Sequence, residues 1–240
     1  MGIFDFLFSG GVSSQLKKHV KRLNNLNAPQ EERLASADWL AENGTPEAID
    51  GILKRFALTY EKQMKDIEEK EYIYRILKSV GSEAVEPTKD WLRRNTAFAF
   101  PLRLIEDLEG EEATVKFLLE LLGLEMDPFK TEKKKQLIIK LGDFVDPRIV
   151  SPVSACLEDY DEEVQLAAIE TLSKQQSNNI HEPFVEALTH PEEESNRLKI
   201  RIAEILEQRG LDLLDKGDRL TNNPPVGWRF DPATNKLVRA

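Results

Sequence analysis

Two short amphipathic helices joined by an acidic turn occupy the stretch from Asp146 to Lys174, and this stretch constrains the fold more than any other feature. Asp146 and Pro147 are typical of a helix start, because the carboxylate caps free N–H groups and proline has no N–H that needs a partner. One helix pair leaves an apolar face unburied, so the pattern predicts that neighbouring pairs stack against it. The apolar side chains recur at helical spacing and are Ile149, Val150, Val153, Cys156 and Leu157 in the first helix and Val164, Ala167, Ala168 and Leu172 in the second.

Similar helix starts occur at Thr45, Ser82 and Glu111, and together with Asp146 they stand about 30 to 37 residues apart. This is the spacing of helix-pair repeats. We therefore expect an all-α fold, a right-handed α-solenoid of about six helix pairs over residues 15–210. The segments outside it are an apolar N-terminal arm at 1–14 and a C-terminal tail at 211–240.

Local signals predict several helix ends. A first helix is expected over 15–25, and Thr45 is expected to cap the helix that follows it. Asp66 and Glu69 have the spacing of a capping box at the start of a helix. Pro101 should kink a helix over 96–108 or delay its start, because proline cannot supply a backbone N–H.

Both ends of the chain carry apolar side chains that need an explanation. The arm has five large apolar residues between Ile3 and Phe8, which either pack on the first helix pair or form an amphipathic foot for a membrane or a partner groove. In the tail, alternation at Trp228 and Phe230 with a turn at 231–232 predicts a small β-hairpin or an extended clip. The tail then either covers the end of the solenoid or anchors a partner.

The stretch from Asp146 to Lys174 resembles a HEAT repeat of the short bacterial type, the phycobilisome-lyase HEAT-like repeat. The whole chain is similar to uncharacterised bacterial HEAT-repeat proteins. The similarity lies in the long loop of the second repeat, in the WLRRN and PLRLIE segments around Trp91 and Arg103, and in the aromatic tail. This resemblance implies an armadillo-like helical superhelix and brings no known activity with it.

Two enzyme families share the architecture that the resemblance implies. The HEAT-like alkylpurine DNA glycosylases need a basic groove with aromatic side chains, and Trp91, Arg93, Arg94 and Arg103 are residues of those types. The alternative for Arg93 and Arg94 is a helix's last turn, where cations complement the helix dipole. The bilin lyases share the repeat type, but no lyase-specific motif can be matched to positions in this chain.

Composition limits the classes of partner and chemistry. The net charge is −10, from 33 Lys and Arg against 43 Asp and Glu, which argues against a dedicated nucleic-acid binder because phosphate contacts need a basic surface. The single cysteine, Cys156, excludes an intrachain disulfide and a CxxC zinc site, and we interpret it as a buried, inert thiol. No glycine-rich phosphate loop and no apolar run of membrane-spanning length occurs, and a cytoplasmic protein is expected.

We therefore expect a non-enzymatic protein-binding scaffold or adaptor that presents a concave face of second helices to a protein partner. No cofactor, metal or small-molecule substrate is expected, and membrane contact through the N-terminal arm is the alternative mode of attachment. Two long loops, 59–65 and 124–130, project from the repeats and offer side chains for binding. The candidate protein-binding residues are Tyr60, Trp91, Arg93, Arg94, Arg103, Phe129, Trp228 and Phe230.

Overall fold

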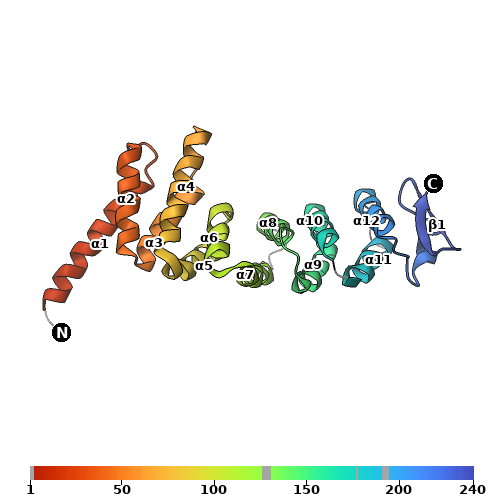
Figure 1. Cartoon of the computed structure of the whole chain (residues 1–240). Coiled ribbons are helices and arrows are strands. Elements are labelled where there is room, and N and C mark those ends of the chain that lie inside the picture. The colour runs from red at the N-terminus through yellow and green to blue at the C-terminus, as the bar shows by residue number, and fades with distance from the viewer. Residues whose placement is uncertain (1–2, 126–130, 177, 191–194) are drawn as a thin grey trace. The chain divides into compact units, whose positions relative to one another are not determined.

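The computed structural model describes residues 3–125, 131–176, 178–190 and 195–240, and most of these residues are helical (Figure 1). The predicted all-α class is therefore confirmed, and so is the small C-terminal hairpin. The chain divides into two compact units, Met1–Thr114 and Val115–Ala240, which we call unit 1 and unit 2. The predicted loop residue Phe129 lies outside the described residues.

Unit 1 consists of helices that alternate between two layers (Figure 1). Helices α1, α3 and α5 lie side by side in the layer of first helices, and α2, α4 and α6 lie side by side in the layer of second helices. Two 3-10 turns, η1 and η2, continue α3 and α4. The bounds are α1 Ile3–Leu23, α2 Gln30–Asn43, α3 Pro46–Leu53, η1 Lys54–Ala57, α4 Gln63–Val80, η2 Gly81–Ala84, α5 Val85–Arg94 and α6 Ala99–Glu109.

The first helix begins earlier than the sequence indicates. Residues 3–14, which we expected to form a separate arm, continue directly into α1, so the helix runs from Ile3 to Leu23 instead of over 15–25. Gly10 and Gly11 lie inside this helix, where each glycine costs only about 1 kcal/mol relative to alanine. The N-terminal segment is therefore part of α1 and not a separate arm.

Local capping signals place two helix starts correctly. The Thr45 hydroxyl accepts a hydrogen bond from the Ala48 N–H at 3.3 Å, and Gly44 ends the preceding helix with a φ of +64°, a left-handed conformation that glycine adopts without strain. Helix α6 starts at Ala99, so Pro101 falls in its first turn, where no intrahelical N–H bond is lost. Proline thus delays the helix, as predicted.

The predicted capping box at Asp66 and Glu69 is wrong. Helix α4 already begins at Gln63, and both carboxylates are buried inside it, at 6% and 2% exposure. Glu69 accepts hydrogen bonds from two arginines: from Arg33 of α2 and, at 2.7 Å, from Nε of Arg55 in η1. Asp66 accepts from Arg55 Nη2 at 2.6 Å. This buried charge cluster joins α2, η1 and α4 in place of a helix cap.

Unit 2 also alternates first and second helices, and α8, α10 and α12 lie on one side of it (Figure 1). Helix α7 crosses the division between the units. The first helix of the central repeat is a short α-helix with a 3-10 turn at each end. The bounds are α7 Glu111–Leu124, α8 Thr131–Leu141, η3 Pro147–Ile149, α9 Val150–Ser154, η4 Ala155–Glu158, α10 Glu162–Lys174, η5 Asn178–Ile180, α11 His181–Thr189, α12 Asn196–Arg209 and η6 Gly217–Leu220.

Neutral side chains on α10 and directly after its last residue connect it to the elements before it. The Thr171 hydroxyl donates to the Ile138 carbonyl at 2.8 Å, which ties α10 to α8. The buried Gln175 amide donates to the Phe144 carbonyl at 2.9 Å and accepts from the Asp146 N–H at 3.1 Å. The Asp146 carboxylate in turn caps η3 by accepting from the Arg148 N–H at 2.8 Å, as its sequence predicts.

The C-terminal tail is an antiparallel hairpin of β1 (Trp228–Asp231) and β2 (Lys236–Arg239) that packs on α12 and η6. Lys236 Nζ donates to the Gly210 carbonyl at the end of α12, at 2.7 Å. A Cβ atom at Gly217 would lie 2.4 Å from the Phe230 ring, so only glycine allows η6 to approach the hairpin this closely. The hairpin therefore covers the end of unit 2, which is one of the two roles expected for the tail.

Candidate functional site

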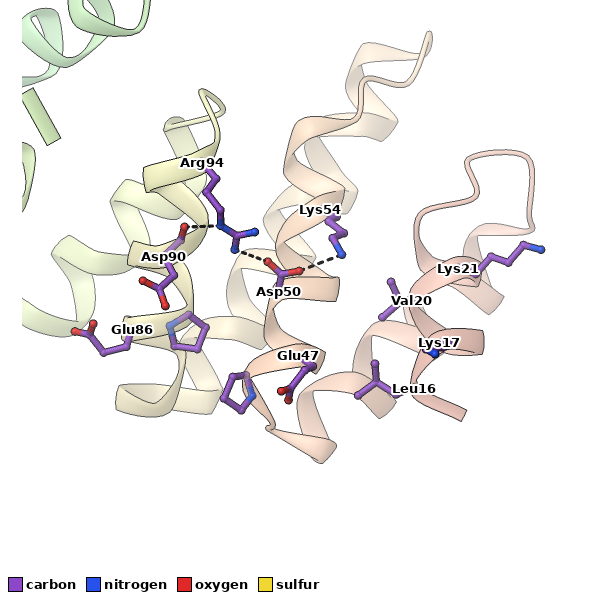
Figure 2. Close-up of a pocket in the computed structure, with 12 residues that line it drawn as sticks. Leu16, Lys17, Val20, Lys21, Glu47, Asp50, Lys54, Glu86, Asp90 and Arg94 are labelled. Atoms are coloured by element: carbon purple, nitrogen blue, oxygen red, sulfur yellow. Dashed lines mark hydrogen bonds and ion pairs between the residues drawn. The ribbon is translucent and has the colours of Figure 1, made fainter. Parts of the chain in front are cut away.

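A groove lies on the first-helix layer of unit 1, across α1, α3 and α5 (Figure 2). We call it the α1–α3–α5 groove. Its volume is about 680 Å³, and apolar side chains of all three helices lie at its base. The residues that line it are Leu16, Lys17, Val20, Lys21, Pro46, Glu47, Asp50, Lys54, Glu86, Pro87, Asp90 and Arg94.

The close approach of α1 to α3 shapes this base. A Cβ atom at Gly51 would lie 2.3 Å from a Val20 methyl group, so the helices can touch here only because residue 51 is glycine. The Asn24 side-chain amide donates to the Gly51 carbonyl at 3.0 Å and holds the contact. Leu16 and Val20 are half-buried, and Figure 2 shows both side chains pointing from α1 toward the space above α3.

Ion pairs close one end of the groove. Asp50 of α3 pairs with Lys54 at the start of η1 and with Arg94 of α5, each at 3.0 Å, and these contacts are drawn in Figure 2. Arg94 Nε also donates to the Asp90 carbonyl at 3.0 Å. The carboxylate of Asp50 therefore has a cation on two sides, and this end of the groove is polar.

The two long sides of the groove carry opposite charge. Lys17 and Lys21 stand one helical turn apart on α1, and neither forms an ion pair with a described residue. Glu86 and Asp90 stand one turn apart on α5, with side chains 72% and 66% exposed. In their pairs with Lys89 and Arg93, at 3.3 and 2.6 Å, the carboxylate is the more exposed partner, so the negative groups are the ones that the α5 side presents to solvent.

Three of the predicted site residues lie on α5. Arg94 lines the groove, as described above. Arg93 pairs with Asp90 at 2.6 Å on the same helix. Trp91 is only 2% exposed and belongs to the core, so it offers no surface for a partner. The two arginines do lie in the last turn of the helix, where they also complement its dipole.

The remaining predicted residues lie elsewhere and do not form one site. Arg103 of α6, in the second-helix layer, pairs with Glu71 at 2.9 Å and stacks 4.1 Å from the Tyr74 ring. Tyr60 lines a smaller cavity beside α2. Trp228 is 3% exposed beneath Arg239, and Phe230 contacts Gly217 as described above. Trp91 and Trp228 were predicted to anchor a partner, and this prediction is wrong, because both are core residues. Large aromatic rings gain most by burial.

Sequence reasoning missed most of the groove. Leu16, Val20 and Leu23 have the spacing of one helix face, but only Leu23 is fully buried. The binding surface was expected on the second helices, whereas the groove lies on the first helices. A usable signal was the repetition of charge at four-residue spacing, lysine at 17 and 21 and carboxylate at 86 and 90, next to an apolar stripe.

Within the described ranges, no three His, Cys, Asp or Glu side chains lie close enough together to hold a metal ion. Burial raises the pKa of the Cys156 thiol to about 11, so it is protonated and a weak nucleophile at neutral pH. No helix among the described residues combines the length and apolar character needed to cross a bilayer.

Comparison with known proteins adds little to this geometry. No protein-family model matches the chain, and no curated protein matches it. Among solved structures, an engineered protein from the Northeast Structural Genomics Consortium aligns over 87% of this chain and 89% of its own, at 16% identity and a TM-score of 0.33. At that TM-score the likeness supports no conclusion about fold or function.

Proposed function

We propose that this protein is a non-enzymatic scaffold that holds a helical segment of a protein partner in the α1–α3–α5 groove. The observation that carries the proposal is the pairing of an apolar base with one basic and one acidic side. A helix can place an apolar stripe on the base while its two flanking edges meet both sides at once. A strand cannot, because its side chains alternate above and below and its edges are backbone.

The charges define the partner's chemistry. Lys17 and Lys21 favour a helix edge with acidic residues four positions apart, and Glu86 with Asp90 favours a basic edge with the same spacing. Two exposed pairs on each edge contribute about 1–2 kcal/mol in total per edge, or roughly tenfold in affinity. The partner segment is therefore an amphipathic helix with oppositely charged edges.

Three synthetic helical peptides test this proposal by fluorescence anisotropy. They share one leucine stripe and carry one acidic and one basic edge, two acidic edges, or two basic edges. The wild-type protein should bind the mixed peptide about tenfold more tightly than the others. The K17E/K21E variant should instead prefer the basic peptide, and the E86K/D90K variant the acidic one. The proposal fails if no peptide binds or if the preference does not follow the substitutions.

A second copy of the chain is the rival occupant of the groove. Sedimentation of the wild-type protein and of the K17E/K21E variant distinguishes it. If the wild-type protein forms a dimer that the variant loses, the groove joins two copies and the partner proposal is overturned. A monomer at the concentrations used for anisotropy is the expected result.

We also propose the HEAT-like, right-handed α-solenoid as the finer description of the fold, and the cytoplasm as the location. The layering of alternate helices inside each unit supports the first, and the single cysteine agrees with the second. A compact globule of this length has a radius of gyration of about 18 Å. Small-angle scattering should give a clearly larger value for a solenoid, and a value near 18 Å contradicts it.

A further inference from the structure

The α1–α3–α5 groove differs between its two ends. Glu47 lies in the first turn of α3 and Glu86 in the first turn of α5, and both residues are exposed. Lys54 directly follows α3, and Arg94 is the last residue of α5. Figure 2 shows the two glutamates at one end of the groove and the two cations at the other. We call these the glutamate end and the cation end.

The cation end offers hydrogen-bond donors. The side chains of Lys54 and Arg94 are 54% and 62% exposed, so an occupant of the groove can reach them. Both pair with the Asp50 carboxylate at 3.0 Å, and Arg94 Nε also donates to the Asp90 carbonyl. An ammonium and a guanidinium together carry more N–H groups than one carboxylate and one carbonyl accept. Donors therefore remain for an occupant.

The glutamate end offers acceptors. An ionised carboxylate accepts hydrogen bonds and donates none. The side chain of Glu86 is 72% exposed, whereas that of its partner Lys89 is 15% exposed, so the carboxylate is the group nearer to solvent. Glu47 of the neighbouring helix is exposed as well. Two carboxylates from two helices thus stand where an occupant enters this end.

The distance between the two ends fits a short helix. Lys54 stands seven residues after Glu47, and Arg94 stands eight residues after Glu86. At a rise of about 1.5 Å per residue, each interval spans about 10–12 Å. A bound helix of about two to three turns therefore has its first turn at one end of the groove and its last turn at the other.

The two ends of such a helix have opposite needs. Its first turn presents free N–H groups and about half a positive charge, and its last turn presents free carbonyl groups and about half a negative charge. Carboxylates stabilise a first turn, and lysine or arginine stabilises a last turn. The half-charges at the ends of α3 and α5 act in the opposite sense. They are smaller than the unit charges of the exposed side chains, which stand nearer to the occupant.

We propose that the partner segment is a short helix that starts at the glutamate end and ends at the cation end, so that it runs parallel to α3. This inference rests on the proposed function and adds the direction and the length of the bound segment. Lys54 and Arg94 donate to the carbonyl groups of its last turn, and Glu47 and Glu86 accept from the N–H groups of its first turn. These four residues select direction, whereas the charged sides select the edges.

Two stapled peptides of about ten residues test the direction. Both have a leucine stripe, one acidic edge and one basic edge, and they differ only in which flank of the stripe is acidic. The charged sides of the groove therefore fit one peptide in each direction. A benzophenone group at either terminus, with mass spectrometry of the crosslinked product, shows which way each peptide runs.

The peptide whose N-terminus crosslinks at the glutamate end should bind about two- to fivefold more tightly than the other, by fluorescence anisotropy. Equal affinities, or tighter binding of the peptide that runs the other way, would overturn this inference and leave the proposed function standing. If neither peptide binds, the proposed function itself fails.

Substitutions then test which residues set the direction. The double variant K54Q/R94Q should reduce the preference between the two peptides, because it removes the charges of the cation end. The matched control is K78Q/R103Q, which removes two cations of α4 and α6 that pair with Asp107 and Glu71, and it should leave the preference unchanged. If the preference is the same in K54Q/R94Q as in the wild-type protein, these cations do not orient the partner.

Discussion

The two units join their helices with different kinds of polar contact. In unit 1, Arg33, Arg55, Asp66 and Glu69 are all at most 6% exposed, and each side chain is paired with an opposite charge inside the cluster. In unit 2, the buried side chains of Thr171 and Gln175, 2% and 1% exposed, donate neutral hydrogen bonds to backbone carbonyl groups. Removing one partner of a buried ion pair costs more than removing a neutral hydrogen bond, because it leaves a charge buried without compensation. The comparison predicts that losing one buried polar partner destabilises unit 1 more than unit 2.

Glu69→Gln is expected to have the largest effect. The substitution keeps the shape of the side chain but leaves Arg33 and Arg55 buried without their shared carboxylate, which should cost about 3–5 kcal/mol. The matched control is Glu71→Gln on the same helix, where the lost partner is Arg103 and the carboxylate is 41% exposed, with an expected cost of about 0–1 kcal/mol. Chemical denaturation measures both, and equal costs would show that the cluster is not structural.

Hydrogen exchange then tests whether the loss is confined to unit 1. Amides of α2 and α4 should exchange faster in the Glu69→Gln variant, because the cluster joins these helices. Amides of α10, whose links to α8 and to the loop before η3 are neutral, should be unaffected. Uniform acceleration in both units would show that the chain unfolds as one cooperative body.

Acid should remove the same stabilisation. Burial alone would raise the pKa of Glu69, but the hydrogen bonds and positive charges of Arg33 and Arg55 outweigh it, and the pKa lies below its ordinary value of 4.5. The pKa of Asp66 is likewise held below 3.8 by Lys70 and Arg55, against the opposing effect of burial. A carboxyl with a lowered folded pKa stabilises the protein above the unfolded value and loses that contribution as the pH falls through the folded value.

The difference in unfolding free energy between the wild-type protein and the Glu69→Gln variant should therefore be greatest near neutral pH. It should shrink as the pH falls below about 4.5, because protonated Glu69 resembles glutamine. Denaturation curves across this range measure the difference. If it stays constant down to the acid limit, Glu69 is not the ionised partner of the two arginines.

More of the fold than of the sites could be predicted from the sequence. Helix ends depend on residues close by in the chain, whereas the sites depend on residues that are far apart in it. Helix ends depend on neighbouring residues, so Thr45, Gly44 and Pro101 gave correct starts and stops. The Asp66–Glu69 spacing fits a capping box equally well, and only partners 36 and 14 residues away, Arg33 and Arg55, show that it is not one.

The groove was missed for a related reason. Periodicity shows that Leu16 and Val20 belong to an apolar face, but whether that face is covered depends on where α3 and α5 pack. An absent neighbour leaves no signal in the local sequence.

The smallest effect is expected where unit 2 does use charge between helices. Arg201 of α12 pairs with Glu170 of α10 through two hydrogen bonds, one of them 2.9 Å long, but the two side chains are 30% and 43% exposed. Water screens such a pair, so Arg201→Gln should cost only about 0.2–1 kcal/mol. The cost should fall further in about 1 M salt, where the Debye length is roughly 3 Å. The cost of Glu69→Gln should change little with salt, because water and ions do not reach that cluster. If Arg201→Gln proves as costly as Glu69→Gln and equally insensitive to salt, the exposure of an ion pair does not determine how much it stabilises this protein. The difference between the units would then depend only on how many partners each charged side chain has.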